Sequence, residues 1–266
     1  FKLITLVTEP DDLFLQKSEL GNSFIGIKIL SEILSYGKSY VYISFYKQSI
    51  GGVFSAALCK TGSNILMYSN AMADINEIRD FCFAVGFDNI QTCDDRLFQN
   101  SLIFQNSLNP KPQKFTVLKK QISAPFNNDK SDSDFYFNGN YKRVYEILTH
   151  SPSPDICMPD LMGFYADISH KVRRKTACTA VLYNSAAAVI SHIYGHSGVL
   201  SGIAVLPKRQ KSGYGSEVLN GAVLSSGIKT VYTAASKTNL PFYIKNGFTE
   251  LYSVYSYTKQ SEYENA

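Results

Sequence analysis

The sequence lacks the features that mark several large classes of protein. It has no tryptophan, no apolar run long enough to span a bilayer, and no charged-then-apolar secretion signal at its N-terminus. Its net charge of +4 over 266 residues is too small to indicate a nucleic-acid binder. We therefore expect a cytoplasmic protein with no membrane and no nucleic acid among its partners.

Cysteine is scarce and dispersed. The cysteines show no metal-ligand spacing, so we expect no metal site. An odd, scattered set is typical of free thiols in a reducing compartment. Cysteines of this kind are more often small buried hydrophobic side chains than catalytic thiols. The five are Cys59, Cys82, Cys93, Cys157 and Cys178.

The composition that remains is that of a globular protein. Hydrophobic residues make up 45% of the chain and charged residues 18%, and 18 tyrosines and 17 phenylalanines supply bulky core packing. A chain of this length buries one large core or two modest ones. The polar stretch 127–134 has no hydrophobic periodicity and is the best candidate for a linker. The sequence therefore predicts domains at 1–126 and 135–266.

Hydrophobic periodicity predicts helices and strands in both halves. A helix over 23–36 places five apolar residues on one face (Phe24, Ile27, Leu30, Ile33 and Leu34) and ends at Gly37. A helix over 73–85 ends at Gly86, where we expect a left-handed conformation. Further helices are expected over 141–149 and 159–174, and strands over 1–8, 40–46, 52–60, 64–68, 101–107, 114–120, 176–183, 186–194, 199–205, 228–233 and 251–258.

The stretch 205–216 carries the clearest functional signal. An apolar run stops at Pro207, and Gly213 and Gly215 then begin an amphipathic run, so the predicted order is strand, loop and helix. Glycines let the backbone come close to a ligand, and the first N–H groups of the helix point at it with the positive end of the helix dipole. Such a turn binds anions, most naturally phosphate. Positive charge is added by Lys208, Arg209 and Lys211.

The pattern Gln210-x-x-Gly213-x-Gly215 resembles the pyrophosphate-binding motif of the GNAT (GCN5-related N-acetyltransferase) family. The loop lacks the Gly-Lys-Ser/Thr ending of a Walker loop and comes too late in the chain for a Rossmann fingerprint. The order of the later segments also matches the family: a short strand-like run, a helix with a Gly-Phe turn at 242–248, and a closing strand. The resemblance covers roughly the last half of the chain. It implies an α/β (α+β) fold with a mixed, mostly antiparallel sheet and flanking helices.

The resemblance implies acetyl-CoA as the cofactor. In the family a bulge splays the strand before the loop from its neighbour, and the pantetheine arm pairs with strand backbone in that gap. One backbone N–H there, of Ala204 or Val205, stabilises the oxyanion. Ser236 stands where relatives often carry an asparagine, a departure from the pattern. The implied cofactor-binding residues are Ile203, Ala204, Val205, Gln210, Lys211, Ser212, Gly213, Tyr214, Gly215, Ser216 and Ser236.

The implied reaction is direct transfer of an acetyl group to a primary amine of a small molecule or peptide. Tyr243 stands where the family places the acid that protonates the leaving thiolate, and the alternative is a core tyrosine. The general base stays open. Glu217 fits better as a partner of the helix dipole, and His192 and His196 are weaker candidates than a structural role or a water chain.

The acceptor side is less clearly marked. The stretch 167–174 resembles one found in some bacterial members of the family, and Asp167, His170 and Arg174 are candidates to face an acceptor. A solvated helix end with cations near its C-terminus is the favoured alternative. Two other functions compete with the transferase: a non-catalytic acyl-CoA-binding or protein-interaction module, and aminoacyl transfer from charged RNA. We expect a monomer or a homodimer.

The N-terminal half carries a faint echo of the C-terminal half. Residues 81–87 align without gaps with 242–248, each as a helix ending in Gly-Phe, which places Cys82 opposite Tyr243. We interpret the N-terminal half as a degenerate copy of the GNAT-like fold or a related α/β domain. Because it lacks a basic glycine loop, we expect it to hold no cofactor and to have a structural or substrate-shaping role.

Overall fold

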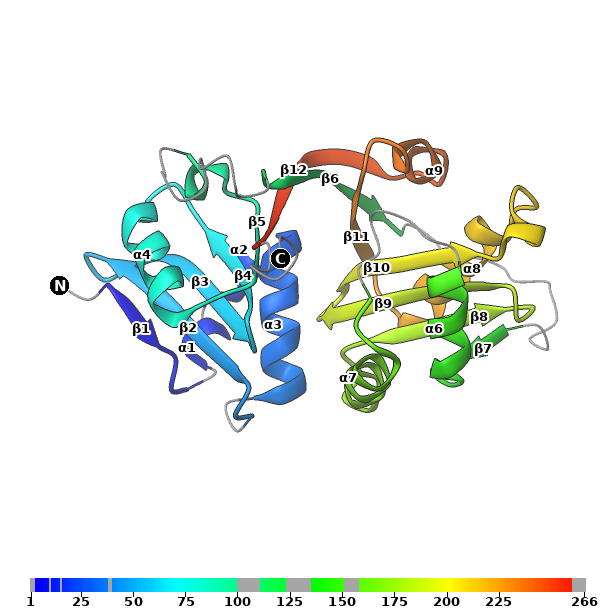
Figure 1. The fold of residues 1–266 in the computed structure, drawn as a ribbon, viewed down its shortest axis with the longest axis horizontal. Coiled ribbons are helices and arrows are strands. Elements are labelled where there is room, and N and C mark those ends of the chain that lie inside the picture. Colours follow the sequence, from blue (N-terminus) through cyan, green and yellow to red (C-terminus); the bar gives the residue numbers. More distant parts are fainter. Residues whose placement is uncertain are drawn as a thin grey trace, which may run out of the picture. The chain divides into compact units, whose positions relative to one another are not determined.

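The chain forms two compact units. The computed structural model describes residues 3–9, 11–14, 16–37, 40–99, 111–122, 135–150 and 158–259. Unit 1 consists of Phe1–Phe115 together with Tyr252–Ala266, and unit 2 of Thr116–Leu251, so the chain crosses between them twice (Figure 1). The predicted domains, 1–126 and 135–266, divide the chain at other points. The predicted linker 127–134 lies outside the described residues, and that division stays a prediction.

Unit 1 is a mostly antiparallel sheet with helices packed on it. Its strand order is β1-β2-β3-β4-β5-β12, and β4 and β5 form a parallel pair. Along the chain it contains β1 (Ile4–Leu6), α1 (Asp11–Phe14), α2 (Lys17–Leu20), α3 (Phe24–Tyr36), β2 (Ile43–Ile50), β3 (Val53–Thr61), β4 (Asn64–Ser69), α4 (Ile75–Val85), β5 (Asn89–Thr92), the short helix η1 (Asp95–Leu97) and the C-terminal part of β12 (Thr249–Thr258).

The long helix α3 of unit 1 shows how local sequence sets its limits. The Ser23 hydroxyl accepts a hydrogen bond from the Gly26 N–H (3.0 Å), which caps the first turn. The helix ends at Gly37, whose φ of +63° favours glycine. Of the predicted apolar face, Phe24, Ile27, Leu30 and Ile33 are buried, and Leu34 is 44% exposed.

Unit 2 repeats the same kind of sheet. Its strand order is β6-β11-β10-β9-β8-β7, with β10 and β11 parallel and the other pairs antiparallel. It contains β6 (Gln113–Gln121) from Thr116 onward, β7 (Phe135–Phe137), α6 (Tyr141–His150), α7 (Leu161–Arg173), β8 (Cys178–Leu182), β9 (Ala186–Tyr194), β10 (Ser197–Val205), the short helix η3 (Pro207–Arg209), α8 (Tyr214–Ser226), β11 (Thr230–Ala235), α9 (Leu240–Lys245) and the first residues of β12.

Two apolar layers cover the sheet of unit 2, because successive strand residues point to opposite faces. One layer packs under α8 and α9, and includes Ala180, Ala188, Leu219 and Val231. The other packs under α6 and α7, and includes Val144, Ile147, Phe164, Val181 and Val189. The central strands therefore read as continuous apolar runs, which agrees with the sequence.

Both units contain two parallel strands that are joined by a helix. In unit 1 the parallel pair is joined as β4-α4-β5, and in unit 2 as β10-α8-β11. The equivalent of α4 is therefore α8, whereas α9 follows the second parallel strand. The alignment of 81–87 with 242–248 paired helices that are not equivalent, and Cys82 does not stand where Tyr243 stands. A Gly-Phe pair ends both helices, which produced the false match.

The remaining predicted elements are present within a few residues of their expected limits. The expected strand 101–107 lies outside the described residues. Gly86 has a positive φ of 70°, but its ψ of 139° is outside the left-handed helical region that was predicted. The predicted fold class is confirmed. Within the described part of the chain, no helix has the length and apolar character needed to cross a membrane.

Candidate cofactor site

The candidate site of unit 2 begins where two parallel strands part. Strands β10 and β11 pair from Ser197 opposite Thr230 to Leu200 opposite Thr233. At Leu200 the pairing of β10 with β9 also shifts register, which is the bulge that the family resemblance implied. Beyond it, β10 continues to Val205 paired with β9, while β11 continues to Ala235 paired with β6. The ends of the two strands therefore separate, and Ile203, Ala204 and Val205 lie on the separated part of β10.

The loop that comes after β10 is held by bonds to the turn between β8 and β9, to the end of β10 and within the loop. The Leu206 N–H donates to the Ser185 carbonyl (2.8 Å), and the turn η3 then leads to Gln210. The Gln210 side chain donates through Nε2 to the Val205 carbonyl (3.1 Å), and its own N–H donates to the Pro207 carbonyl (3.3 Å). These contacts indicate that Gln210 positions the loop on the end of the strand.

The two glycines of the loop serve different needs. Gly213 is the N-cap of α8 in the left-handed region (φ +86°), with open space where a side chain would begin. A Cβ on Gly215 would lie 3.1 Å from Cε2 of Phe242 and 3.6 Å from Cγ2 of Val205. Gly215 therefore lets the start of α8 approach both α9 and the end of β10.

The N-terminus of α8 is open. No side chain caps it, and the first N–H to bond within the helix is that of Glu217, to the Gly213 carbonyl (3.1 Å). The N–H groups of Tyr214, Gly215 and Ser216 precede that bond and point out of the helix end. Lys208, Arg209 and Lys211 are exposed beside it. This arrangement of N–H groups, helix dipole and cations suits the pyrophosphate of a nucleotide-like cofactor.

An aromatic stack flanks this helix end, and sequence analysis missed it. The guanidinium of Arg209 lies 6.0 Å from the Tyr214 ring centroid, and the centroids of the Tyr183 and Tyr214 rings are 5.3 Å apart. Tyr183 comes from the turn between β8 and β9, where it has a positive φ of 48°. No local pattern links residue 183 to residue 214, so only the fold reveals the stack.

Tyr243 lies in α9 and is a core residue. Its ring packs edge-on against Phe242 (5.2 Å between centroids) and Phe248 (5.4 Å), and only 7% of the residue is exposed. This burial suits the alternative of a structural tyrosine, and the role of acid stays a prediction. Ser236 comes directly after β11, and its carbonyl accepts from the N–H groups of Asn239 (3.0 Å) and Leu240 (3.2 Å) at the start of α9. The Ser212 hydroxyl donates to the Gln210 carbonyl (3.4 Å).

Of the three candidate bases, only Glu217 lies near the loop. His196 is in the turn that begins β10, at the opposite end of that strand from the loop. His192 is buried on β9, opposite Val199, and its Nδ1 lies 2.6 Å from the Ser191 hydroxyl oxygen. Glu217 is in the first turn of α8, where its charge suits the helix dipole. None of these positions assigns the base.

The candidate acceptor residues lie near the end of α7. Asp167 forms an ion pair with Lys171 (3.1 Å), whose side chain is only 5% exposed. Arg174 caps the helix, and its N–H donates to the His170 carbonyl (3.1 Å). Cations at a helix C-terminus agree with the favoured structural interpretation. Among the described residues, no group of three histidine, cysteine or acidic side chains is arranged to hold a metal ion.

Comparison with known proteins identifies the fold. Neither a scan against protein-family models nor a search of curated proteins found a match. Solved structures do match over nearly the whole chain. A tandem GNAT protein from the clavulanic acid biosynthesis pathway is 8% identical, with 97% of this chain and 99% of that chain covered and a TM-score of 0.56. A GCN5-related N-acetyltransferase from Sphaerobacter thermophilus is 10% identical (97% and 96% covered, TM-score 0.54).

A third match is a Drosophila protein that is 10% identical, with 96% of this chain and 98% of that chain covered and a TM-score of 0.65. At such low identity the likeness concerns the fold, which agrees with the repeated strand-helix-strand succession in the two units. The N-terminal part of the chain thus shares the architecture that the sequence suggested only faintly. The chain has the fold of the GNAT acetyltransferases, in a form that contains two GNAT-like units.

Proposed function

We propose that this protein is a GNAT family enzyme whose unit 2 transfers an acetyl group from acetyl-CoA directly to a primary amine of a small molecule or peptide. The observation that carries the proposal is the open N-terminus of α8 at the point where β10 and β11 part. An uncapped helix start surrounded by three exposed cations is suited to a pyrophosphate. The separated backbone of β10 is suited to an extended arm such as pantetheine.

The residues of unit 2 have distinct roles in this proposal. Acetyl-CoA, when bound, supplies an activated thioester. The N–H groups of Tyr214, Gly215 and Ser216 bind its phosphate oxygens, and Lys208, Arg209 and Lys211 neutralise their charge. A backbone N–H of Ala204 or Val205 donates to the thioester oxygen, where negative charge develops as the amine attacks. Gln210 keeps the loop on the strand through its bond to the Val205 carbonyl.

The proton balance requires one donor and one acceptor. The attacking amine loses a proton, and the departing thiolate gains one. A tyrosine hydroxyl has a pKa near that of a thiol and is a suitable donor, and Tyr243 is the proposed one. The proton acceptor is not assigned: the two histidines lie away from the loop, and Glu217, in the first turn of α8, fits better as a partner of the helix dipole.

A turnover assay tests the proposal. Protein, acetyl-CoA and a set of small primary amines or a lysine-containing peptide are mixed, and released thiol and acetylated product are both measured. We expect Tyr243→Phe to lower turnover by about 100-fold while acetyl-CoA affinity stays close to that of the wild type. Tyr232→Phe, which changes another buried tyrosine of unit 2, is the matched control. Equal turnover in Tyr243→Phe and wild type would exclude Tyr243 as the acid.

The burial of Tyr243 favours one second candidate, a module that binds acyl-CoA without catalysis. It predicts binding of acetyl-CoA and no acetylated product with any amine tested. The same assay, paired with a binding measurement, separates the two functions.

A further inference from the structure

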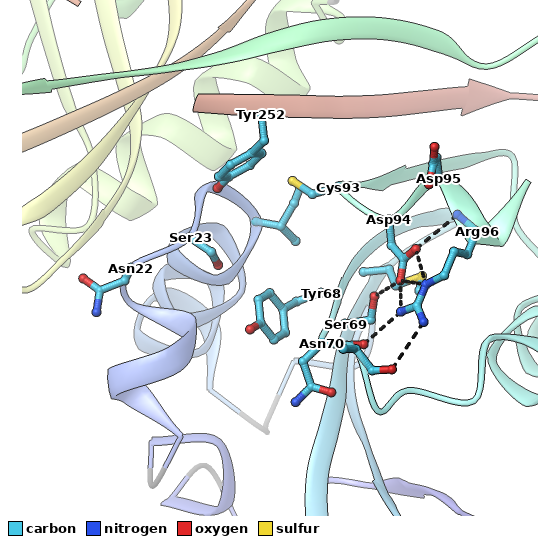
Figure 2. Close-up of a pocket in the computed structure, with 13 residues that line it drawn as sticks. Asn22, Ser23, Tyr68, Ser69, Asn70, Cys93, Asp94, Asp95, Arg96 and Tyr252 are labelled. Atoms are coloured by element: carbon cyan, nitrogen blue, oxygen red, sulfur yellow. Dashed lines mark hydrogen bonds and ion pairs between the residues drawn. The ribbon is translucent and has the colours of Figure 1, made fainter. Parts of the chain in front are cut away.

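Unit 1 contains a cavity of about 420 Å³ at the place that matches the candidate site of unit 2. The parallel pairing of β4 and β5 ends with Met67 opposite Thr92. The residues that follow this pairing, Tyr68–Ala71 and Cys93–Arg96, line the cavity together with the start of α3 and Tyr252 (Figure 2). Crevices beyond the carboxyl ends of parallel strands are common ligand sites in α/β proteins. The size is also within the range of small-molecule pockets.

The cavity has a fixed frame. The Arg96 guanidinium binds the Asp94 carboxylate with Nη2 to Oδ2 at 2.6 Å, and it also donates to the Asn70 carbonyl (2.9 Å). The Ser69 hydroxyl donates to Asp94 (2.6 Å), so the end of β4 and the segment after β5 are held together (Figure 2). The Asn70 side chain donates to the Phe54 carbonyl (3.1 Å). A frame held by these bonds pre-forms the cavity for a ligand.

This cavity is poorly suited to a pyrophosphate. The adjacent helix α4 begins at Asp74, whose carboxylate accepts from the N–H groups of Asn76 and Glu77 (3.1 Å each), so the helix end already holds an anion. Arg96 is engaged by Asp94 and by backbone carbonyls. No basic loop precedes α4 in the sequence 70–74. Acyl-CoA therefore lacks its main anchor here.

The charge around the cavity favours a cation. Asp94 and Asp95 line it, and Glu19 accepts hydrogen bonds from two lining side chains, the hydroxyl of Tyr68 (2.8 Å) and the amide of Asn70 (3.0 Å). Both donors use Oε1 of Glu19, so Oε2 is bonded to no described residue. The three carboxylates outnumber the positive groups nearby, which are the guanidinium of Arg96 and the ammonium of Lys28. Lys28 donates to Gln91 (2.6 Å), and neither Lys28 nor Glu19 lines the cavity itself.

The other lining groups suit the carbon part of a small amine and do not react with it. The rings of Tyr68 and Tyr252 line the cavity, and aromatic faces attract ammonium groups. Burial and the bond to Glu19 raise the pKa of Tyr68 above its usual value, and burial raises the pKa of the Cys93 thiol to about 12. Both groups therefore stay protonated near neutral pH, which excludes Cys93 as a nucleophile there.

We propose that the cavity of unit 1 is a second ligand site, which binds a small organic ammonium compound through Asp95 and the aromatic walls, with the charge of Glu19 behind Tyr68 and Asn70 adding to the attraction. This site is separate from the cofactor site proposed for unit 2. Its ligand is recognised by positive charge, whereas the ligand at α8 is recognised by negative charge.

Titration calorimetry on the full chain, without acetyl-CoA, tests this site. The probe is 1,4-diaminobutane, and 1,4-butanediol is its uncharged counterpart. We expect saturable binding of the diamine and none of the diol at about 10 mM. The double variant Glu19→Gln/Asp95→Asn keeps an oxygen that accepts from Tyr68 and Asn70 but removes two charges. It is expected to weaken diamine binding by about tenfold or more. Asp80→Asn, an exposed carboxylate on α4, is the control and should bind as the wild type does.

Three results would overturn the proposal: no diamine binding by the wild type, equal binding of the diol, or full diamine affinity in the double variant. The last result would place the amine elsewhere, for example at an acceptor groove of unit 2. If the double variant unfolds at a lower temperature than the wild type, the single variant Asp95→Asn carries the test, because that side chain is exposed and supports no described side-chain hydrogen bond. The absence of acetyl-CoA keeps this outcome independent of the transferase proposal.

Discussion

The helix starts of α4 and α8 occupy the same place in the two units and differ in chemistry. In unit 1 the Asp74 carboxylate binds the N–H groups of Asn76 and Glu77, so the protein supplies its own anion. In unit 2 the corresponding position is Gly213, which has no side chain, and α8 begins without a cap. A helix start whose N–H groups already bond to a side chain of the protein has few donors left for a phosphate, whereas an uncapped helix start has several.

The charged residues near these helices also differ between the units. Unit 2 places Lys208, Arg209 and Lys211 beside its open helix end, and unit 1 places Asp94 and Asp95 in the neighbouring cavity. The two units thus carry opposite charge near the carboxyl ends of their parallel strands. The comparison shows why fold alone does not assign function: the few residues that come after these strands decide which charge each unit presents.

The largest expected effect comes from closing the open helix end. Gly213→Glu places negative charge at the N-terminus of α8 and should lower acetyl-CoA affinity by about 100-fold or more. Gly227→Glu is a close control, because Gly227 caps the other end of α8, also with a positive φ (68°) and open space around it. Each substitution carries a similar backbone strain of about 1–2 kcal/mol. The measurement is the rise in unfolding temperature on adding acetyl-CoA, and an equal rise in both variants would show that the loop does not bind the cofactor.

A smaller effect is expected from opening the capped helix end. Asp74→Ala removes the cap of α4 and should lower the free energy of unfolding by about 1 kcal/mol. Asp80→Ala, on the exposed face of the same helix, should change it much less. Denaturant unfolding measures both. A destabilisation of Asp80→Ala as large as that of Asp74→Ala would show that the cap is not the cause.

The smallest expected effect is the pH dependence of the bond between Asp94 and Arg96. Burial by itself would raise the pKa of Asp94, but hydrogen bonds from Arg96 and Ser69 lower it below its usual value. A carboxylate with a lowered pKa in the folded state adds stability above its unfolded pKa of about 4, and this is lost as the pH falls through the folded pKa. The difference in unfolding temperature between Asp94→Asn and wild type should therefore begin to shrink as the pH falls below about 4, and should vanish below the folded pKa of Asp94. A constant difference between them at all pH values would contradict this.

Local signals in the sequence were sufficient for the loop of unit 2. Pro207 ends an apolar strand, and Gly213 and Gly215 mark the start of a helix, so the anion-binding turn could be predicted from residue types and spacing. The cap of α4 was also readable, because Asp74 and Glu77 have the spacing of a capping box. In the structure Glu77 instead accepts from the Leu3 N–H (2.8 Å) and the Gln48 side chain (2.8 Å).

The pairing of strands that are far apart in the chain could not be predicted from the sequence. Alternation of apolar and polar residues predicts that 114–120 is a strand. Nothing in that pattern specifies that the strand pairs with β11 of unit 2, where Thr116 lies opposite Ala235. In the same way, Tyr255–Thr258 pair with β5 of unit 1 although they end the chain's last strand. The false alignment of 81–87 with 242–248 has a similar origin, since a Gly-Phe helix end carries no information about the neighbouring strands. The cavity of unit 1 depends on these pairings and was therefore not predicted.

The stoichiometry of acetyl-CoA binding tests the central claim most directly. Titration calorimetry of the full chain should give one site per chain, and Gly213→Glu should abolish it. That result would locate the cofactor at α8 and leave unit 1 without it. Two sites per chain, or one site that survives Gly213→Glu, would contradict the claim that only the open helix end holds the cofactor.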